Sequence, residues 1–247
     1  MIILKNKSEL EIMRIAGQIS AQALALGGEM VKPGVTTGQI DLALTKFIRS
    51  QNSTPSFMDN GFPASACISV NDEVIHGVPG NREILPGDIV SIDVGACYKG
   101  FHGDNAATFA AGEISDEVRL LLEHTRESLY KGIEQAVPDA RVGDISHAVQ
   151  THAEQFGYGV VREYIGHGVG RNLHESPEIP NYGKPGRGPR LAAGMVMAIE
   201  PMINLHAKEV KTRSDGHTVV TVDGHPSAHF EHTIAITENG PVILTQV

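Results

Sequence analysis

Apolar residues recur at helical spacing twice within the first fifty positions of the chain. Ser8 and Glu11 fit a capping box, so the apolar positions that follow predict a first helix. A turn at Lys32–Gly34 separates it from a second helical stretch, for which Thr37 has the side chain of an N-cap. The apolar positions are Ile12, Ile15, Ile19, Ala23, Leu26 and Met30 in the first helix, and Ile40, Leu44, Phe47 and Ile48 in the second.

The same pattern returns 105 residues further along the chain. The matching segments are Met13–Ile15 with Val118–Leu120, Pro33 with Pro138, and Gly38–Ile40 with Gly143–Ile145. Two copies indicate a duplicated half rather than a solenoid of many repeats. We therefore expect a single domain over residues 1–247, with related halves near 1–112 and 113–247.

Short runs with strand character follow each predicted helix pair. They are Ala66–Val70, Ile89–Ala96 and Phe101–Phe109 in the first half, and Val160–Tyr164, Met195–Ile199, Thr218–Val222 and Phe230–Thr237 in the second. Helices and strands in two similar halves predict an α+β fold with a site between the halves.

Composition narrows the class of protein. A net charge of −9 disfavours a general nucleic-acid binder, and we interpret the basic cluster Lys184–Arg190 as a solvated loop. The longest apolar run, Leu191–Ile199, is too short to span a membrane, and the N-terminus lacks the apolar core of a secretory signal. Cys67 and Cys97 fit reduced thiols rather than a disulfide framework. We expect a soluble, cytoplasmic protein.

Two aspartates in the segment Val90–Asn105 point most directly to chemistry. If Tyr98 and Lys99 form a two-residue hairpin turn, Asp93 lies opposite Asp104. Two carboxylates ~4.5 Å apart repel each other by roughly 3 to 4 kcal/mol at an effective dielectric constant near 20. The pairing therefore predicts a divalent cation between them.

Three further residues lie in sequence contexts that suit metal ligands. His167 is flanked by glycines, Glu200 ends an apolar run, and Glu231 lies inside strand-like sequence. Taken singly, a loop histidine or a solvated strand glutamate explains each, and a phosphate-binding glycine loop fails because Leu173 replaces its third glycine. Together, four carboxylates and one imidazole suit two ions of Mn²⁺, Fe²⁺, Co²⁺ or Zn²⁺, and such pairs promote hydrolysis.

These residues, in this order and spacing, resemble the ligand set of the type I methionine aminopeptidases. The motifs that carry the resemblance are Cys67–Pro79, Ile92–Val94, Phe101–Asp104, Gly166–Arg171, His174–Pro177, Ile199–Met202 and Phe230–Thr233. The resemblance implies the pita-bread fold, with two pseudo-symmetric halves of antiparallel sheet, helices outside and a dinuclear metal centre between the halves. It also implies removal of the initiator methionine from new polypeptides whose second residue is small.

The resemblance also assigns roles to residues of this chain. It implies that Asp93 chelates one ion, that Asp104 and Glu231 bridge both, and that His167 and Glu200 complete the other. Glu200 would also act as general acid and base. Two more histidines match positions along the substrate backbone: they are His76 and His174, of which His174 would stabilise the oxyanion.

The methionine pocket of the family corresponds here to five residues. They are Phe62, Cys67, Tyr164, Leu173 and His217. Apolar, polarizable walls suit a thioether. At His217 the chain departs from the family, which usually has tryptophan there, and this chain contains no tryptophan. We predict that His217 widens or polarises the pocket.

Two alternatives share the fold that the resemblance implies. X-Pro aminopeptidases and prolidases use the same metal set, but they usually carry a large N-terminal domain, for which the first helix near Ser8 leaves no room. A non-catalytic binding module is disfavoured by the five ligand-type residues. The partners implied are the N-termini of nascent polypeptides, with transient ribosome contact left open. We expect a monomer that binds neither a membrane nor a stable nucleic-acid partner.

Overall fold

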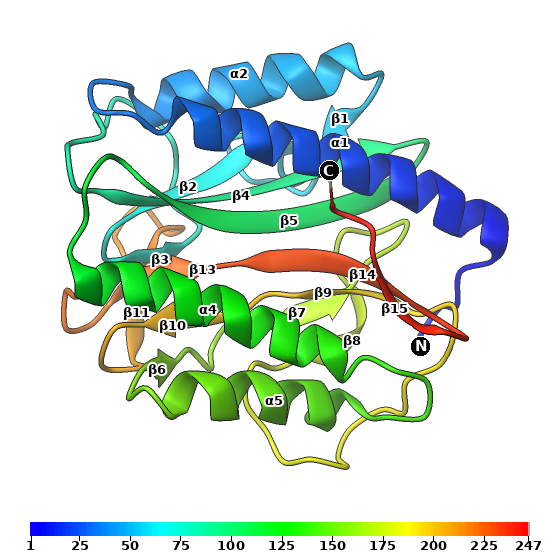
Figure 1. Ribbon diagram of the computed structural model, residues 1–247. Coiled ribbons are helices and arrows are strands. Elements are labelled where there is room, and N and C mark those ends of the chain that lie inside the picture. Colours follow the sequence, from blue (N-terminus) through cyan, green and yellow to red (C-terminus); the bar gives the residue numbers. More distant parts are fainter. Residues whose placement is uncertain (247) are drawn as a thin grey trace.

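Two pairs of long helices lie on the near side of a large sheet (Figure 1). The chain is described by a computed structural model over residues 1–246. The helices of this part are α1 (Lys7–Met30), α2 (Thr37–Ser50), α3 (Ser56–Asp59), α4 (Asp116–Glu134) and α5 (Val142–Glu154).

The largest sheet has nine strands, in the order β1-β4-β5-β14-β9-β7-β8, with β15 beside β14 and β2 beside β4. Its strands are β1 (Thr54–Pro55), β2 (Ala66–Val70), β4 (Ile89–Tyr98), β5 (Phe101–Ala110), β7 (Gly166–Gly168), β8 (Glu175–Ile179), β9 (Val196–Ile199), β14 (Glu231–Thr237) and β15 (Gly240–Ile243). Strands from both predicted halves therefore join in one sheet, with β5 and β14 in contact at its centre.

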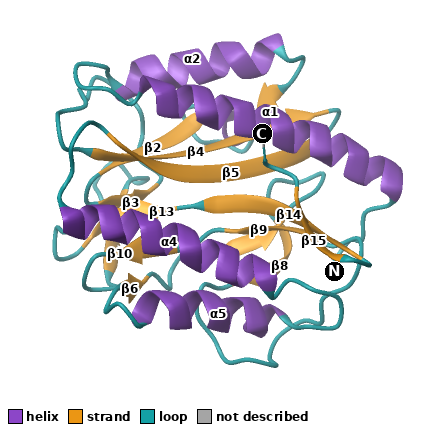
Figure 2. Cartoon of the chain, in the orientation of Figure 1, coloured by secondary structure: helices purple, strands orange, loops and turns teal. Residues whose placement is uncertain are grey.

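Two smaller sheets have the orders β13-β10-β6 and β11-β12-β3. Their strands are β3 (Glu73–Ile75), β6 (Gly159–Val160), β10 (Met202–Asn204), β11 (Val210–Thr212), β12 (Val219–Thr221) and β13 (Ser227–His229). Figure 2 shows β3, β6, β10 and β13 behind and between the helices. The strand pairs are antiparallel, so the predicted α+β class is confirmed.

Each helix pair covers its own apolar core. In the first, Ile19 of α1 and Leu44 of α2 pack with Ile92 of β4. In the second, Leu129 of α4 and Ile145 of α5 belong to one buried cluster with residues of β9 and β14. The helical periodicity of the sequence therefore arises from these buried faces. The two cores lie between the helix pairs and the sheet.

The two helix pairs also match in register. α2 begins at Thr37 and α5 at Val142, which preserves the 105-residue offset of the sequence. An isolated bridge precedes each helix, from Thr36 to Glu83 and from Arg141 to Arg190. These matches support the predicted duplication of halves within a single domain, which stays a prediction.

Helix α1 begins earlier than the sequence predicts, and α2 is also capped one residue earlier. The Asn6 side chain accepts hydrogen bonds from Ser8 N and Glu9 N, both at 3.0 Å, so Asn6 rather than Ser8 is the N-cap. In α2 the cap is Thr36, whose hydroxyl accepts from Gln39 N at 3.2 Å. Each cap lies one position before the first helical residue, where its side chain can reach the unpaired N–H groups.

The β4–β5 hairpin has a different turn from the one predicted. Tyr98 pairs with Phe101, so the turn residues are Lys99 and Gly100, with φ values of 48° and 75°. A two-residue hairpin turn of this type needs positive φ at both positions, which glycine adopts readily. The prediction that Asp93 lies opposite Asp104 was therefore wrong. The register moves by two residues, so both side chains stay on the same face of the sheet.

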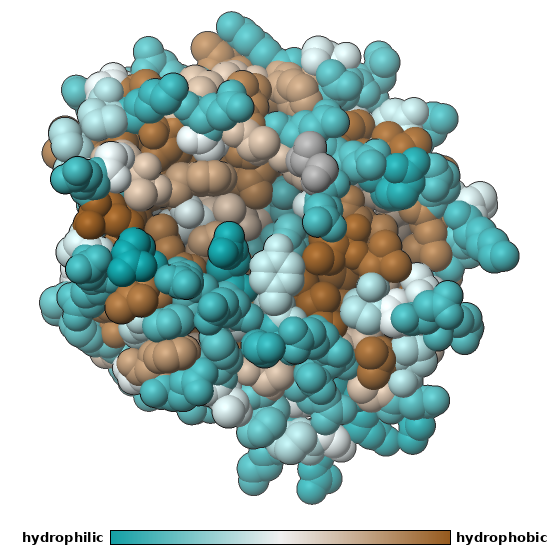
Figure 3. Space-filling model, viewed as in Figure 1, coloured by the Kyte–Doolittle hydropathy of each residue, from teal (hydrophilic) through white to brown (hydrophobic). Residues whose placement is uncertain are grey.

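The face shown in Figure 3 is mostly hydrophilic, with a hydrophobic band between the two helix pairs. A cavity of about 440 Å³ lies there, lined by residues that include Leu24 of α1, Phe109 of β5 and Leu122 of α4. Among the described residues, no helix combines the length and the apolar character that crossing a bilayer requires.

Candidate metal centre and substrate cavity

Three acids lie side by side on the central strands. Asp93 on β4 and Glu231 on β14 both pair with Ala106 of β5, so one small side chain separates two carboxylates. Asp104 lies two residues before Ala106 and hence on the same face. Its cross-strand partner is Gly95, where an added Cβ would lie 3.2 Å from Asp104 Oδ1. The glycine and the alanine leave the space in which the acids converge.

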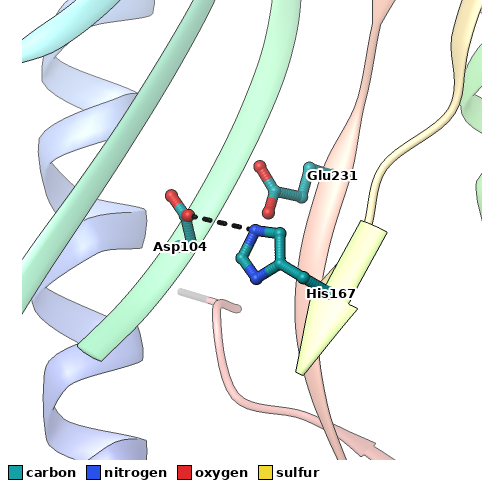
Figure 4. Close-up of side chains that lie close together, drawn as sticks. All are labelled: Asp104, His167 and Glu231. Atoms are coloured by element: carbon teal, nitrogen blue, oxygen red, sulfur yellow. Dashed lines mark ion pairs between the residues drawn. The ribbon is translucent and has the colours of Figure 1, made fainter. Parts of the chain in front are cut away.

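The other strands of the sheet bring two further candidate ligands to this cluster. His167 lies in β7, and Glu200 directly follows β9. His167 Nε2 is 3.4 Å from Glu200 Oε1 and 4.0 Å from Asp104 Oδ2. Ligand atoms of Asp104, His167 and Glu231 all lie within 4.8 Å of one another (Figure 4).

Burial makes the ionised form of these acids unfavourable. It raises the pKa of Asp93, Glu200 and Glu231 well above the usual values, and their mutual repulsion adds to the effect. Burial likewise raises the pKa of Asp104 to about 7. Without a cation the cluster therefore retains protons at neutral pH, whereas a bound divalent ion favours the ionised carboxylates.

The donor set fits divalent metal. Among residues 1–246, Asp93 Oδ1, Asp104 Oδ1 and Glu231 Oε1 are buried with no hydrogen-bond partner. His167 Nδ1 donates to Gly168 O at 2.9 Å, so the neutral ring directs the Nε2 lone pair toward the carboxylates. A lone pair facing buried oxygens is unfavourable unless a cation lies between them. Burial also lowers the pKa of His167 to about 4, which keeps it neutral.

A cavity of about 540 Å³ opens onto the acid cluster. Eleven of the twelve residues predicted from the sequence line it, and only His217 is not among them. The eleven are Phe62, Cys67, His76, Asp93, Asp104, Tyr164, His167, Leu173, His174, Glu200 and Glu231. Tyr164 does so from a loop, because the strand predicted over Val160–Tyr164 ends at Val160. The structure thus brings together residues from both predicted halves.

Two histidines flank the acids. His76 follows β3 with a φ of 56°, an uncommon conformation for a residue with a Cβ, and its ring lies edge-on to Tyr164 at 5.5 Å. The ring of His174 lies 4.3 Å from that of His167. Burial lowers the pKa of His76 to about 4 and lowers that of His174. Both are therefore neutral hydrogen-bond donors at pH 7.

Apolar side chains close one side of the cavity. Phe57, Cys67 and Leu173 form a small buried cluster against which Phe62 packs. Burial, with the adjacent Asp93 charge as a smaller cause, raises the pKa of the Cys67 thiol, so it stays protonated. His217 is exposed beyond this wall, with its ring edge-on to Phe62 at 5.6 Å.

Sequence reasoning missed a buried histidine beneath Glu200. His229 Nε2 lies 3.8 Å from Glu200 Oε2 and has no hydrogen-bond partner among residues 1–246. Burial lowers the pKa of His229 to about 3. The sequence offers one sign of this position: His229 lies two residues before Glu231 in strand-like sequence, and residues two apart in a strand share a face.

A buried ion pair holds the segment that carries His174. Lys5 Nζ donates to Glu175 Oε2 at 2.6 Å, and both side chains are about 95% buried. Glu175 Oε1 also accepts from Asn172 N at 3.2 Å. The pair ties the N-terminal segment to the residue next to His174, a link that neither local sequence predicts.

The sequence model of metallopeptidase family M24 matches residues 11–238. The chain belongs to this family. In curated M24 relatives the similarity extends over the full length. The methionine aminopeptidase of Clostridium perfringens is 55% identical, with 100% of each chain covered. Methionine aminopeptidase 1 of Bacillus subtilis is 54% identical over the same share.

Solved M24 structures separate into two groups by coverage. The methionine aminopeptidase of Thermotoga maritima matches with a TM-score of 0.98 and 45% identity, covering 100% of both chains. A prolidase from Pyrococcus furiosus matches with a TM-score of 0.79 and 25% identity, covering 99% of this chain but 66% of the prolidase. The shared fold is that of pita-bread enzymes, as the sequence predicted.

Metal binding should strengthen as pH rises. Protons compete for the buried carboxylates, whose raised pKa values reach about 7 at Asp104, while His167 with its pKa of about 4 does not compete near neutrality. In the metal-free protein, the stability from protonated Asp104 is complete below pH 3.8 and is lost as pH rises through about 7. Thermal unfolding with and without Mn²⁺ should therefore show a larger metal-induced rise in Tm at pH 8 than at pH 5.5. An equal rise at both pH values contradicts this expectation.

Breaking the Lys5–Glu175 pair should destabilise the protein. Lys5→Met leaves the Glu175 carboxylate buried and unpaired, which costs about 3 to 5 kcal/mol. Urea unfolding measures the loss, and Lys5→Met/Glu175→Gln is the matched control, which should recover much of it. A cost below about 1 kcal/mol for Lys5→Met shows that the pair does not hold this segment.

Proposed function

We propose that the chain is a type I methionine aminopeptidase, which removes the initiator methionine from nascent or newly made polypeptides when the second residue is small. The observation that carries the proposal is the apolar wall of Phe62, Cys67 and Leu173 directly beside the acid cluster in one cavity. An unbranched thioether suits such a wall. Full-length identity of 55% to a methionine aminopeptidase supports the same activity.

The proposed ligands are Asp93, Asp104, His167, Glu200 and Glu231. Asp93 would hold one ion, and His167 and Glu200 would hold the other. Asp104 and Glu231 would bind both ions. Their unpartnered oxygens and raised carboxyl pKa values support this assignment. Two divalent ions of Co, Mn, Fe or Zn bound here would supply Lewis acidity, which activates water and polarises the carbonyl oxygen.

The protein's own side chains would then move the proton and stabilise charge. Glu200 accepts a proton from the attacking water and returns it to the leaving amine. His174 is neutral at pH 7 and donates a hydrogen bond to the oxygen that gains negative charge. His76, edge-on to Tyr164, lies where it can contact the substrate backbone.

We propose that the enzyme acts on protein N-termini in the cytoplasm as a monomer, with at most transient ribosome contact and no stable nucleic-acid partner. Free Cys67 and Cys97 thiols are consistent with a reducing compartment. The net charge of −9 argues against nucleic-acid binding. The match covers 66% of the P. furiosus prolidase but 100% of the C. perfringens methionine aminopeptidase.

Peptide hydrolysis tests the proposed activity. With Mn²⁺, Fe²⁺, Co²⁺ or Zn²⁺, the protein should release free methionine from Met-Ala. The bulkier Met-Leu should react about a hundred-fold more slowly, and Ala-Pro should stay intact. A chelator should abolish release, and the metal should restore it. Cleavage of Ala-Pro without cleavage of Met-Ala contradicts the proposal, and activity that survives metal removal contradicts the proposed ligands.

His217→Trp tests the departure from the family. An indole here extends the apolar wall against Phe62, so kcat/KM for Met-Ala should rise about two- to ten-fold. His147→Trp is the matched control, because His147 is exposed on α5 away from the cavity. An unchanged kcat/KM in His217→Trp contradicts the prediction that His217 widens or polarises the pocket.

A further inference from the structure

A second cavity lies against the catalytic one. It has a volume of about 600 Å³ and lies between the start of α5 and the loop 180–189. Ser176 and Glu178 of β8 line both cavities. The two cavities therefore adjoin at these residues, and we call the second one the downstream groove.

The downstream groove adjoins the metal centre closely. Glu178 is the cross-strand partner of His167, and such partners have Cα atoms about 5 Å apart. An extended chain advances about 3.3 Å per residue. A polypeptide that leaves the catalytic cavity past His167 therefore reaches Glu178 within about two residues.

The walls of the groove are apolar and fixed in place. Pro180, Tyr182 and Pro189 line it, and the backbone of its loop is tied to α5. Val142 N donates to Pro189 O at 3.0 Å, and Gly143 N donates to Arg187 O at 2.9 Å. The backbone of the loop that carries the basic cluster is therefore held against α5 beside the groove.

Two cations of the basic cluster have no counter-ion among residues 1–246. Lys184 and Arg187 line the groove, and within residues 1–246 neither forms an ion pair, whereas Arg190 pairs with Asp139 at 3.0 Å. Unpaired cations beside an apolar groove favour a chain with carboxylate side chains. The carboxylate of Glu178 at the shared wall disfavours acidic substrate residues beside it. The preference for acidic residues should therefore begin at substrate positions beyond Glu178.

We propose that the downstream groove binds the substrate polypeptide beyond the cleaved bond, from about its fourth residue onward, and favours acidic side chains there. This inference rests on the proposed aminopeptidase activity. Pro and Tyr side chains pack an extended segment, and Lys184 and Arg187 select its charge. The enzyme thereby recognises more of the new polypeptide than its first two residues.

The test compares long and short substrates in the metal-loaded enzyme. The peptides are Met-Ala-Ser, the acidic Met-Ala-Ser-Gly-Glu-Glu-Gly-Ser, and the same octapeptide with two lysines in place of the glutamates. Lys184→Glu/Arg187→Glu should lower kcat/KM for the acidic octapeptide about ten-fold, mainly through KM. It should raise kcat/KM for the lysine octapeptide and leave Met-Ala-Ser unchanged. The difference should shrink at high salt.

The control makes the same charge change elsewhere. Lys46→Glu/Arg49→Glu replaces one exposed lysine and one exposed arginine on α2, far from the groove in the fold (Figure 1). The inference is overturned if the groove variant leaves kcat/KM for the acidic octapeptide unchanged, or if the control variant lowers that kcat/KM equally. Failure of the unmodified enzyme to cleave Met-Ala-Ser at all contradicts the proposed function instead, so the two failures are distinguishable.

Discussion

Four carboxylates buried against one another are the constraint on which the rest of this structure depends. Asp93, Asp104, Glu200 and Glu231 repel each other in a low-dielectric site, and burial has already raised the pKa of each. Such a cluster persists in a folded protein only if the surrounding packing supports it and a cation balances it when ionised. The unpartnered oxygens and the lone pair of His167 point to the same requirement.

Different layers of the fold provide the packing and the acid cluster. The outer helix pairs bury the apolar area that stabilises the domain, and the central strands bring the acids together. Across the β5–β14 junction, the Thr233 hydroxyl donates to Asp104 O at 2.7 Å and accepts from Asp104 N at 3.0 Å. The small residues Gly95 and Ala106 leave room beside the acids. Local polar and steric details therefore fix a site that is electrostatically strained.

Helical periodicity was enough to predict the helix pairs, because their buried faces repeat at regular spacing. Short apolar runs predicted seven of the fifteen strands of residues 1–246, among them β4, β5, β9 and β14. The candidate ligands were also predictable, since acids in apolar strand-like sequence need an explanation. The hairpin turn was not predicted correctly. The chain turns at Lys99–Gly100 rather than Tyr98–Lys99 because both turn residues must adopt positive φ, and the expected pairing of Asp93 with Asp104 did not take this requirement into account. The contact of His229 with Glu200 and the Lys5–Glu175 pair were not predicted either, because they join segments that are distant in the sequence.

When metal binds, cations replace protons on the buried acids. Calorimetric titration of Mn²⁺ into the metal-stripped protein, in buffers of different ionisation enthalpy, counts the protons released on binding. With the pKa of Asp104 raised to about 7 and those of the other acids also raised, binding at pH 6 should release more than one proton, and the number should fall as pH rises. Binding without proton release at pH 6, or no binding at all, would contradict this exchange of protons for metal.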